Sequence, residues 1–307
     1  MSGSNLGTGA RPYSSMEQAF NYETAFKRNL GWLSRDEQNR ISKAVIAIPG
    51  MGGVGGHHVH SLARVGFQNF KIADFDQFEL HNFNRQIGAK MSTLGRNKAQ
   101  VMKELILQIN PKAQVQVYSD GVNSSNAEDF LEGVDLVVDG LDLFVIKERI
   151  ELFDRAIAQG IPVLTAGPIG MGTSAVTFRG HGVSFSKYCN INQSMSKKQL
   201  VSRFMSALVP WPMQARYVKM GYDVDFEAGR TPSLHSGVLA ATAHVTTEAI
   251  KLILKRGRIR YAPFSIHYDF YLQKVARPWR PWGNRNPLQR ILIFVFERWY
   301  WTQNSSN

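Results

Sequence analysis

The stretch Ile46-Ala-Ile-Pro-Gly50-Met-Gly52-Gly53-Val-Gly55 places spaced glycines directly after a short apolar segment. In the dinucleotide fingerprint the first glycine allows a tight turn, the second lets the backbone approach a phosphate, and the third lets a helix pack on its strand. Backbone N–H groups at the start of that helix then face the phosphates. The stretch therefore predicts a strand, a nucleotide-binding loop and a helix, in that order.

Short apolar segments alternate with segments of helical periodicity on both sides of this loop. We expect strands at 45–48, 70–75, 115–118, 136–138 and 162–165. We expect helices at 54–65, 93–109, 127–131 and 144–159, and later a helix at 236–254 and a strand at 264–269. This alternation predicts an α/β fold with a doubly wound, Rossmann-like sheet, whose parallel core carries C-terminal antiparallel additions.

Charged residues follow the loop at positions where ligands collect in such a sheet. Asp74 comes about 20 residues after the loop, where a carboxylate can hold ribose hydroxyls. Arg85 and Lys98 supply two cations, and Asp142 follows the strand at 136–138. Hydride transfer has no use for this cluster, whereas displacement at an α-phosphate does, because charge builds on the leaving pyrophosphate. The pattern favours phosphate chemistry.

With these residues in place, the chain resembles the ThiF/MoeB/HesA family, the bacterial relatives of ubiquitin-activating enzymes. The resemblance covers roughly residues 20–275 and, as a set of spacings, is far more specific than one glycine motif. The matching segments are Gly50-x-Gly52-Gly53-x-Gly55, Ala73-Asp74-Phe75-Asp76, Asn82-Phe-Asn-Arg85-Gln86, Lys98, Asp142, Thr165-Ala-Gly-Pro-Ile-Gly170-Met-Gly172, Gly237-Val-Leu and Tyr268-Asp269, with Phe26-Lys-Arg28-Asn29 upstream.

The resemblance implies ATP-dependent adenylation of a carboxylate by a homodimer, with release of pyrophosphate and formation of an acyl-adenylate for transfer. It implies that ATP and Mg²⁺ are the cofactors and that Asp142 binds the metal. The implied catalytic residues are Arg85, Lys98, Asp142 and Arg28, the last usually supplied by the partner subunit. The implied nucleotide-binding residues are Gly50, Gly52, Gly53, Gly55, Asp74 at the ribose, Asp76 in its support, and Asn82, Arg85 and Lys98 at the phosphates.

The carboxylate substrate stays open. A ubiquitin-like protein tail or a short peptide is one possibility, and a modified tRNA base carrying a carboxylate, as used by tRNA-modifying dehydratases or cyclases of this family, is the alternative. The net charge of +12 is uneven, since residues 251–307 hold eleven Lys and Arg but two acidic residues, and a basic surface attracts polyanions. An NAD(P)-dependent oxidoreductase and a catalytically silent binding module are further alternatives.

The chain organisation follows from composition. We expect a flexible N-terminus at 1–20, an adenylation domain at 21–275 and a basic aromatic tail at 276–307. Inside the domain, the nucleotide-binding core covers 43–180 and an irregular, variable loop region covers 181–232. The chain shows no secretory signal and no apolar run near the ~20 residues that span a bilayer, so we expect a cytoplasmic protein without a transmembrane segment. The apolar stretch 291–300 leaves docking on a partner or a membrane surface open.

Three further groups of residues have both a functional and a structural interpretation. The single cysteine, Cys189, excludes an internal disulfide and a cysteine-built zinc site, and a thioester role is disfavoured because only Lys187 is near it as an activating group. His57, His58 and His60 have a spacing that favours packing over metal binding. Asp139 is expected to end its strand with backbone partners rather than to bind metal.

Overall fold

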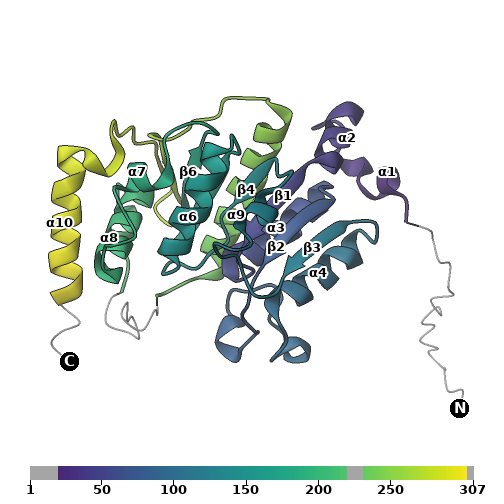
Figure 1. The fold of residues 1–307 in the computed structure, drawn as a ribbon, viewed down its shortest axis with the longest axis horizontal. Coiled ribbons are helices and arrows are strands. Elements are labelled where there is room, and N and C mark those ends of the chain that lie inside the picture. Colours follow the sequence, from purple (N-terminus) through teal and green to yellow (C-terminus); the bar gives the residue numbers. More distant parts are fainter. Residues whose placement is uncertain (1–19, 220–230, 303–307) are drawn as a thin grey trace, which may run out of the picture.

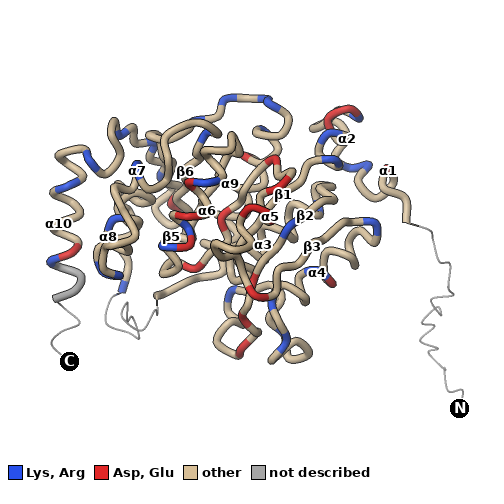
Figure 2. Tube along the Cα trace, in the orientation of Figure 1, with Lys and Arg blue, Asp and Glu red and all other residues tan. Residues whose placement is uncertain are grey.

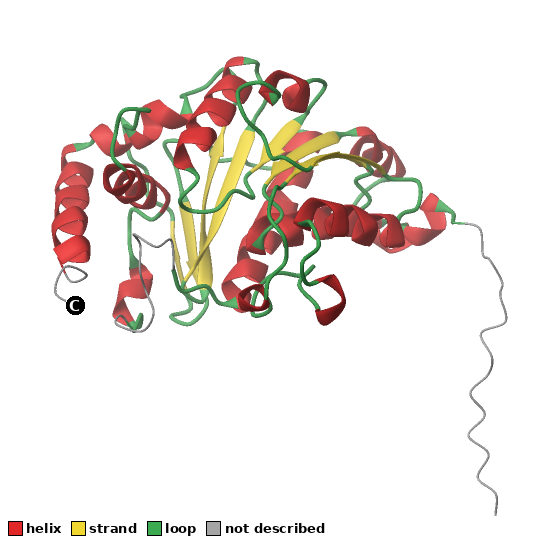
Figure 3. Ribbon diagram, turned by 60° about the horizontal axis from the view of Figure 1, so that its bottom comes forward, coloured by secondary structure: helices red, strands yellow, loops and turns green. Residues whose placement is uncertain are grey.

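The computed structural model describes residues 20–219 and 231–302, so all but the last residue of the predicted N-terminal segment 1–20 lies outside the described residues. Within them an eight-stranded sheet has the order β3-β2-β1-β4-β5-β6-β7-β8. Helices cover both faces of this twisted sheet (Figures 1 and 3). The strands are β1 (Val45–Pro49), β2 (Asn69–Ala73), β3 (Gln114–Tyr118), β4 (Leu136–Val138), β5 (Val163–Ile169), β6 (Gly172–Phe178), β7 (Ile266–Asp269) and β8 (Lys274–Ala276).

The first five strands form the parallel core that the sequence predicts. β1 lies between β2 and β4, and β3 and β5 extend the sheet on either side, all in parallel register. Parallel neighbours need crossover connections, which are helical here. The α-helices are α1 (Tyr22–Ala25), α2 (Arg35–Lys43), α3 (Gly53–Val65), α4 (Lys98–Ile109), α5 (Ala127–Leu131), α6 (Ile146–Ala158), α7 (Phe185–Cys189), α8 (Lys197–Leu208), α9 (His235–Leu254) and α10 (Pro287–Thr302).

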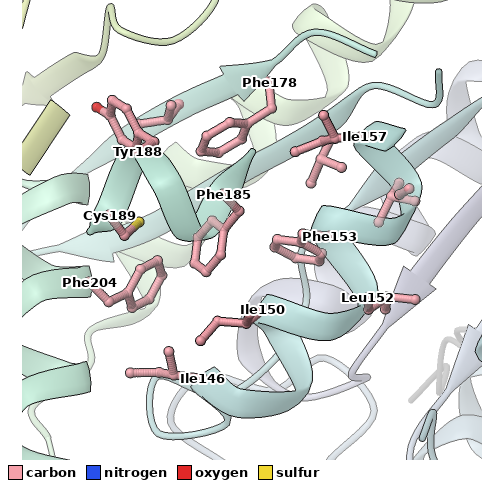
Figure 4. Packing of buried hydrophobic residues seen from close by; sticks show 14 of the residues in the cluster. Ile146, Ile150, Leu152, Phe153, Ile157, Phe178, Phe185, Tyr188, Cys189 and Phe204 are labelled. Carbon is pink, nitrogen blue, oxygen red and sulfur yellow. The ribbon is translucent and has the colours of Figure 1, made fainter. Parts of the chain in front are cut away.

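Two hydrophobic cores lie on the two faces of the sheet. Because side chains alternate along a strand, Ile46 and Ile48 of β1 enter one core, with α3, α4 and α9, while Ala47 enters the other. The second core is aromatic: Phe153 of α6 and Phe178 of β6 both pack against Phe185 of α7 (Figure 4). The sheet is thus buried on both faces, as a parallel sheet requires.

The antiparallel additions are also confirmed. β6 follows β5 after a tight turn and pairs with it in antiparallel orientation. β7 and β8 then extend the sheet beyond β6, each antiparallel to its neighbour. α9 lies across β5 and β6 and beside α3. Among the described residues it is the one helix long and apolar enough to cross a bilayer, contrary to our expectation of no such run. However, half of its apolar window is buried in the fold, as in a core helix.

The region 181–232 contains more regular structure than its polar sequence predicts. α7 and α8 both lie in it, and α8 begins with a capping box between Ser196 and Gln199. Leu200, Phe204 and Leu208 of α8 then recur at helical spacing and are buried. A smaller difference is a helix that begins at 98 instead of 93. N-terminal to α2 the structure has only the short α1 and a 3₁₀ turn at Lys27–Asn29 among the described residues.

The C-terminal segment is attached to α7 and α8 by buried polar side chains. Arg280 donates from Nη1 to Ser206 O (3.0 Å), and Gln289 Nε2 donates to the same carbonyl (2.8 Å). Asn284 Nδ2 donates to Cys189 O (2.8 Å) and to Arg203 O. The carbonyls in the last turn of a helix lack partners within that helix, so these contacts satisfy those of Ser206 and Cys189, and together they fix the segment that leads into α10.

Candidate active site

Three backbone segments meet where the glycine loop leaves β1. Gly50 has φ +87°, a left-handed conformation that favours glycine, and its N–H donates to Ala73 O at 2.7 Å. A Cβ on Gly50 would lie 2.2 Å from Gly140 O, and a Cβ on Gly55 would lie 1.8 Å from Gly50 O. Only glycine fits at these positions, so the start of α3 is held directly against the residues that follow β4.

Gly52 and Gly53 are glycines for a different reason. The atom nearest to a Cβ would be Gln86 Nε2 at 3.7 Å for Gly52 and Arg85 Cγ at 3.6 Å for Gly53, which are ordinary contacts. Gly52 is the N-cap of α3 and brings no side-chain acceptor to its first turn. The N–H groups of that turn, together with the helix dipole, therefore suit an anion such as a phosphate.

Asp74 connects the end of β2 to the glycine loop. Its Oδ2 accepts from Met51 N–H (2.6 Å) and its Oδ1 accepts from Asp76 N–H (2.8 Å). Burial raises the pKa of Asp74, and these backbone bonds and the Lys98 charge counter that rise. Each carboxylate oxygen has a further lone pair, so Asp74 can orient the loop and still accept from a hydroxyl group.

Lys98 is a buried cation at the same edge. It is the first residue of α4, its side chain is 8% exposed, and its Nζ lies 3.0 Å from Asp76 Oδ2. Asn97 caps α4 with its side chain and also donates to Asp74 O (3.0 Å). Asp74, Asp76 and Lys98 are thus fixed to one another and to the loop.

The side chains of Arg85 and Gln86 lie beside Gly53 and Gly52 of the glycine loop. Arg85 Nη1 donates to His81 O and to Asn84 Oδ1, both at 2.9 Å. Burial lowers the pKa of Arg85 and the charge of Asp142 counters that fall, so the two groups interact electrostatically. Asn82 is buried and accepts from Glu79 N–H. Gln86 is 7% exposed and its Oε1 has no hydrogen-bond partner among the described residues.

Asp142 lies on a short loop that α6 supports from inside the protein. Arg149, 1% exposed, donates from Nε and Nη2 to the two oxygens of Asp139 (3.0 and 3.2 Å) and from Nη2 to Leu141 O and Asp142 O. Thr165 Oγ1 also donates to Asp139 at 2.6 Å. Asp139 does follow the end of β4, but the expectation of backbone partners is only partly met: Leu141 N–H is a backbone donor, and the other donors to its carboxylate are the side chains of Arg149 and Thr165. Asp142 itself is exposed and accepts from Phe144 N–H.

The donor set at Asp142 fits Mg²⁺ only in company with phosphates. In the two described stretches no three His, Cys, Asp or Glu residues are grouped so that they could hold a metal ion. Mg²⁺ commonly binds through one or two carboxylates and completes its shell with substrate phosphates and water. A single exposed carboxylate beside a phosphate-binding loop matches that mode of binding.

Arg28 is a predicted site residue that lies far from the glycine loop of its own chain. Its neighbour Asn29 donates to Val65 O at 2.7 Å, so this segment lies at the C-terminal end of α3. The glycine loop lies at the other end of the same 13-residue helix, about 18 Å away along its axis. At that position the exposed side chain of Arg28 does not reach the glycine loop of its own chain.

Cys189 and the histidines are structural in this chain. Cys189 is 1% exposed in the aromatic core, beside Phe185 and Phe204 (Figure 4), and burial raises the pKa of its thiol. Burial also lowers the pKa of His57 to about 4 and that of His58 to about 3. The packing interpretation of these histidines is confirmed, and Cys189 is inaccessible to an acyl group.

The residues that the sequence analysis did not single out are Gln86 and Arg149. Gln86 ends the motif Asn82-Phe-Asn-Arg85-Gln86, but the motif gave it no role. In the structure its side chain lies beside Gly52, and its buried Oε1 has no hydrogen-bond partner among the described residues. Arg149 is one of several charged residues on a helix of mixed composition. Its burial depends on partners from other elements, so no local pattern could have identified it.

The sheet, the glycine loop and the adjoining cations define a nucleotide-binding α/β protein built to handle phosphates. The model of the ThiF family matches residues 26–290, and the chain belongs to this family. It is 33% identical over 156 residues to a tRNA threonylcarbamoyladenosine dehydratase of Haemophilus influenzae, covering 50% of this chain and 59% of that protein. It is also 33% identical over 130 residues to a probable adenylyltransferase/sulfurtransferase MoeZ of Mycobacterium tuberculosis, covering 42% of this chain and 33% of MoeZ.

Solved structures agree on the fold. The crystal structure of Escherichia coli MccB with MccA has a TM-score of 0.63 at 17% identity, over 88% of this chain and 75% of that chain. Escherichia coli tRNA N6-threonylcarbamoyladenosine dehydratase has a TM-score of 0.52 at 21% identity, over 76% of this chain and 97% of that chain. At these identities the likeness shows the fold alone. The chain spans from about a third to three fifths of the curated relatives it matches.

Proposed function

We propose that this protein uses ATP to adenylate a carboxylate, releasing pyrophosphate. The observations that support it best are that Arg85 packs beside Gly53, that Arg85 interacts electrostatically with Asp142, and that Lys98 is held by Asp76 after Asp74. Two cations and one exposed carboxylate at a phosphate-binding loop suit a reaction in which negative charge builds on a departing pyrophosphate. A protein that only binds a dinucleotide needs no such group.

Each residue receives a role in this proposal. The N–H groups at Gly52 and Gly53 bind phosphate, and Gly50 and Gly55 keep the loop against the residues after β4. Asp74 holds the ribose. The remaining residues act as follows: Asp76 orients Lys98; Asn82, Arg85 and Lys98 contact the phosphates; Asp142 holds the ion that accompanies ATP.

When bound at Asp142, Mg²⁺ would neutralise phosphate charge during the displacement. The chain's own contribution is to keep Asp142 in place: Arg149 binds its carbonyl, and Phe144 N–H binds one carboxylate oxygen. Burial lowers the pKa of Arg85, and the charge of the Asp142 carboxylate counters that fall and so favours the charged guanidinium. The cytoplasm, where ATP is available, is the location we propose.

The proposed assembly is a homodimer in which Arg28 reaches the phosphates of the partner's site. Its position at the far end of α3 supports this proposal. An Arg28→Ala chain mixed with an Asp142→Ala chain tests it, because one site of each mixed dimer then keeps both residues. About a quarter of all sites should recover tight Mg²⁺-ATP binding on mixing, counted by calorimetric stoichiometry. Recovery of none would contradict an arginine supplied in trans.

The proposed activity is tested by calorimetric titration with Mg²⁺-ATP, NAD⁺ and NADP⁺. We expect Mg²⁺-ATP to bind, and Asp142→Ala to weaken that binding by about tenfold or more. Asp120→Ala is the matched control, because Asp120 is an exposed aspartate shortly after β3, which is separated from β4 by β2 and β1 in the sheet. Tight dinucleotide binding that ignores Asp142 would instead indicate an oxidoreductase.

The carboxylate is proposed to be a peptide or protein tail, or else the modified base of a tRNA. The peptide receives support from the fold shared with MccB, solved together with MccA. The tRNA receives support from relatives named tRNA threonylcarbamoyladenosine dehydratase and from the basic C-terminal segment. Pyrophosphate release with tRNA carrying threonylcarbamoyladenosine, compared with unmodified tRNA and with peptides, decides between them. A tRNA substrate should also bind with a steep salt dependence.

A further inference from the structure

Helix α10 presents an apolar face to solvent. It packs on α8 through Gln289 and Ile293, which are 4% and 5% exposed. Four large apolar side chains on its other side are exposed by more than half: Leu288 (74%), Ile291 (60%), Phe294 (60%) and Val295 (52%). α10 lies at the margin of the molecule in both views of the fold (Figures 1 and 3). We call these four residues the outer face.

The outer face is one continuous stripe. Leu288, Ile291 and Val295 follow one another at spacings of three and four residues, which places them on one side of a helix, with Phe294 beside them. α10 has 16 residues and is therefore about 24 Å long. That length is too short to span a bilayer of about 30 Å, but it suits a helix that lies along a surface.

Basic residues border the outer face. Arg285, Arg290 and Arg298 are exposed, and Arg298 lies over the ring of Phe294 at 5.9 Å. Glu297 is the one acidic residue in the sequence from 270 to 307. Figure 2 shows the basic positions spaced along α10 and the segment that leads into it. A partner for this surface must be both apolar and negatively charged.

This combination separates the conceivable occupants. A second copy of the chain packed through the same face would bring the arginines of the two copies into one interface, where like charges repel. RNA would satisfy the arginines but would leave Ile291 and its aliphatic neighbours without an apolar partner. A bilayer with anionic headgroups offers acyl chains to the outer face and negative charge to the arginines that border it.

We propose that α10 docks lengthwise on an anionic lipid membrane, with the outer face at the boundary between headgroups and acyl chains. The contacts of Arg280, Asn284 and Gln289 with α7 and α8 mean that docking through α10 holds the folded domain, not a loose tail. The proposal does not depend on the adenylation activity.

Vesicle flotation with the full-length chain tests this proposal. Binding should occur to vesicles of phosphatidylcholine mixed with phosphatidylserine, should be weak on phosphatidylcholine alone, and should fall as salt is added. Ile291→Glu should weaken binding about tenfold or more. Replacing Arg290 and Arg298 by Gln should weaken it about fivefold for each charge. Met91→Glu, at a residue 73% exposed but outside α10, is the matched control and should bind like the parent.

Four results would overturn membrane docking. One is absence of binding to the anionic vesicles at low salt, and another is binding that Ile291→Glu leaves unchanged while circular dichroism shows a folded protein. The third is a dimer in sedimentation equilibrium that Ile291→Glu disrupts. That result would assign the outer face to a second copy of the chain. A gel shift with tRNA that weakens in the arginine variants, without vesicle binding, would likewise assign the basic residues to RNA.

Discussion

Different kinds of contact stabilise two regions of the molecule: the nucleotide-binding half and the C-terminal unit, which is the segment that packs on α7 and α8. Around the loop after β1, backbone meets backbone, because Gly50, Gly55 and Gly140 leave no room for a Cβ. Where the C-terminal segment meets α7 and α8, buried side chains such as Arg280 and Asn284 bond to helix-end carbonyls instead. Glycine packing demands one residue type at fixed spacing, whereas side-chain anchoring can be built in many ways, so only the first leaves a readable motif.

The largest effect should come from the backbone contact itself. Gly55→Ala would place a Cβ 1.8 Å from Gly50 O and 3.1 Å from Gly140 Cα, so we expect a loss of about 4 kcal/mol or more, or failure to fold. Gly53→Ala is the control, with its nearest contact at 3.6 Å to a side chain. Urea denaturation that finds the two variants equally stable would contradict the argument.

Arg149→Met tests a buried side-chain anchor of the nucleotide-binding half. Removing the guanidinium leaves Asp139 buried without its partner, and we expect a loss of about 3–5 kcal/mol in the free energy of unfolding. The matched control is Arg155→Met on the same helix, whose ion pairs with Glu128 and Glu151 are partly exposed and worth below about 1 kcal/mol. Similar losses for both would mean that burial of the Asp139 pair has little consequence.

Acid should destabilise the contact between α3 and α9 through His58. Its pKa falls from 6.5 to about 3 in the folded state because the ring is buried beside Thr242. The unfolded state therefore binds the proton first, and stability is lost as pH falls below 6.5, by about 3 kcal/mol near pH 4. His58→Gln should reduce this slope in denaturation measured from pH 7 to pH 4, and the remaining slope should include the contribution of His57, whose pKa is lowered to about 4. The exposed control His81→Gln should keep the slope.

The smallest effect is expected in the C-terminal unit. Asn284→Ala removes the donor to Cys189 O and Arg203 O, which should cost about 1–3 kcal/mol. Asn286→Ala is the control, because the side chain of Asn286 makes longer or more exposed bonds. Proteolysis should then cleave the segment after α9 faster in the Asn284 variant. Equal cleavage rates would show that the C-terminal unit does not depend on this anchor.

The sequence predicted the part of the fold that local rules control. β4 falls where the three buried residues Leu136–Val138 were expected, and the glycines mark the loop. Two helices in the 181–232 region were missed, because the polar residues around Ser196 concealed the capping box that begins α8. In the site, the loop and charged residues gather as expected, although their roles stay predictions. Arg28 could not be placed, since only the three-dimensional path shows that it lies behind α3.

The contact between Gly50, Gly55 and Gly140 has a consequence for protein engineering. Gly140 N–H also donates to Pro49 O at 3.0 Å. Residues 49–55 and 139–142 therefore form one structural unit that is built from two segments of the chain. A library that randomises either segment alone, in search of a different nucleotide, would mostly return misfolded chains. Transplanting both together into a related scaffold keeps their spacing, and sequence variation is better placed at Gln86, whose side chain borders the loop without supporting it.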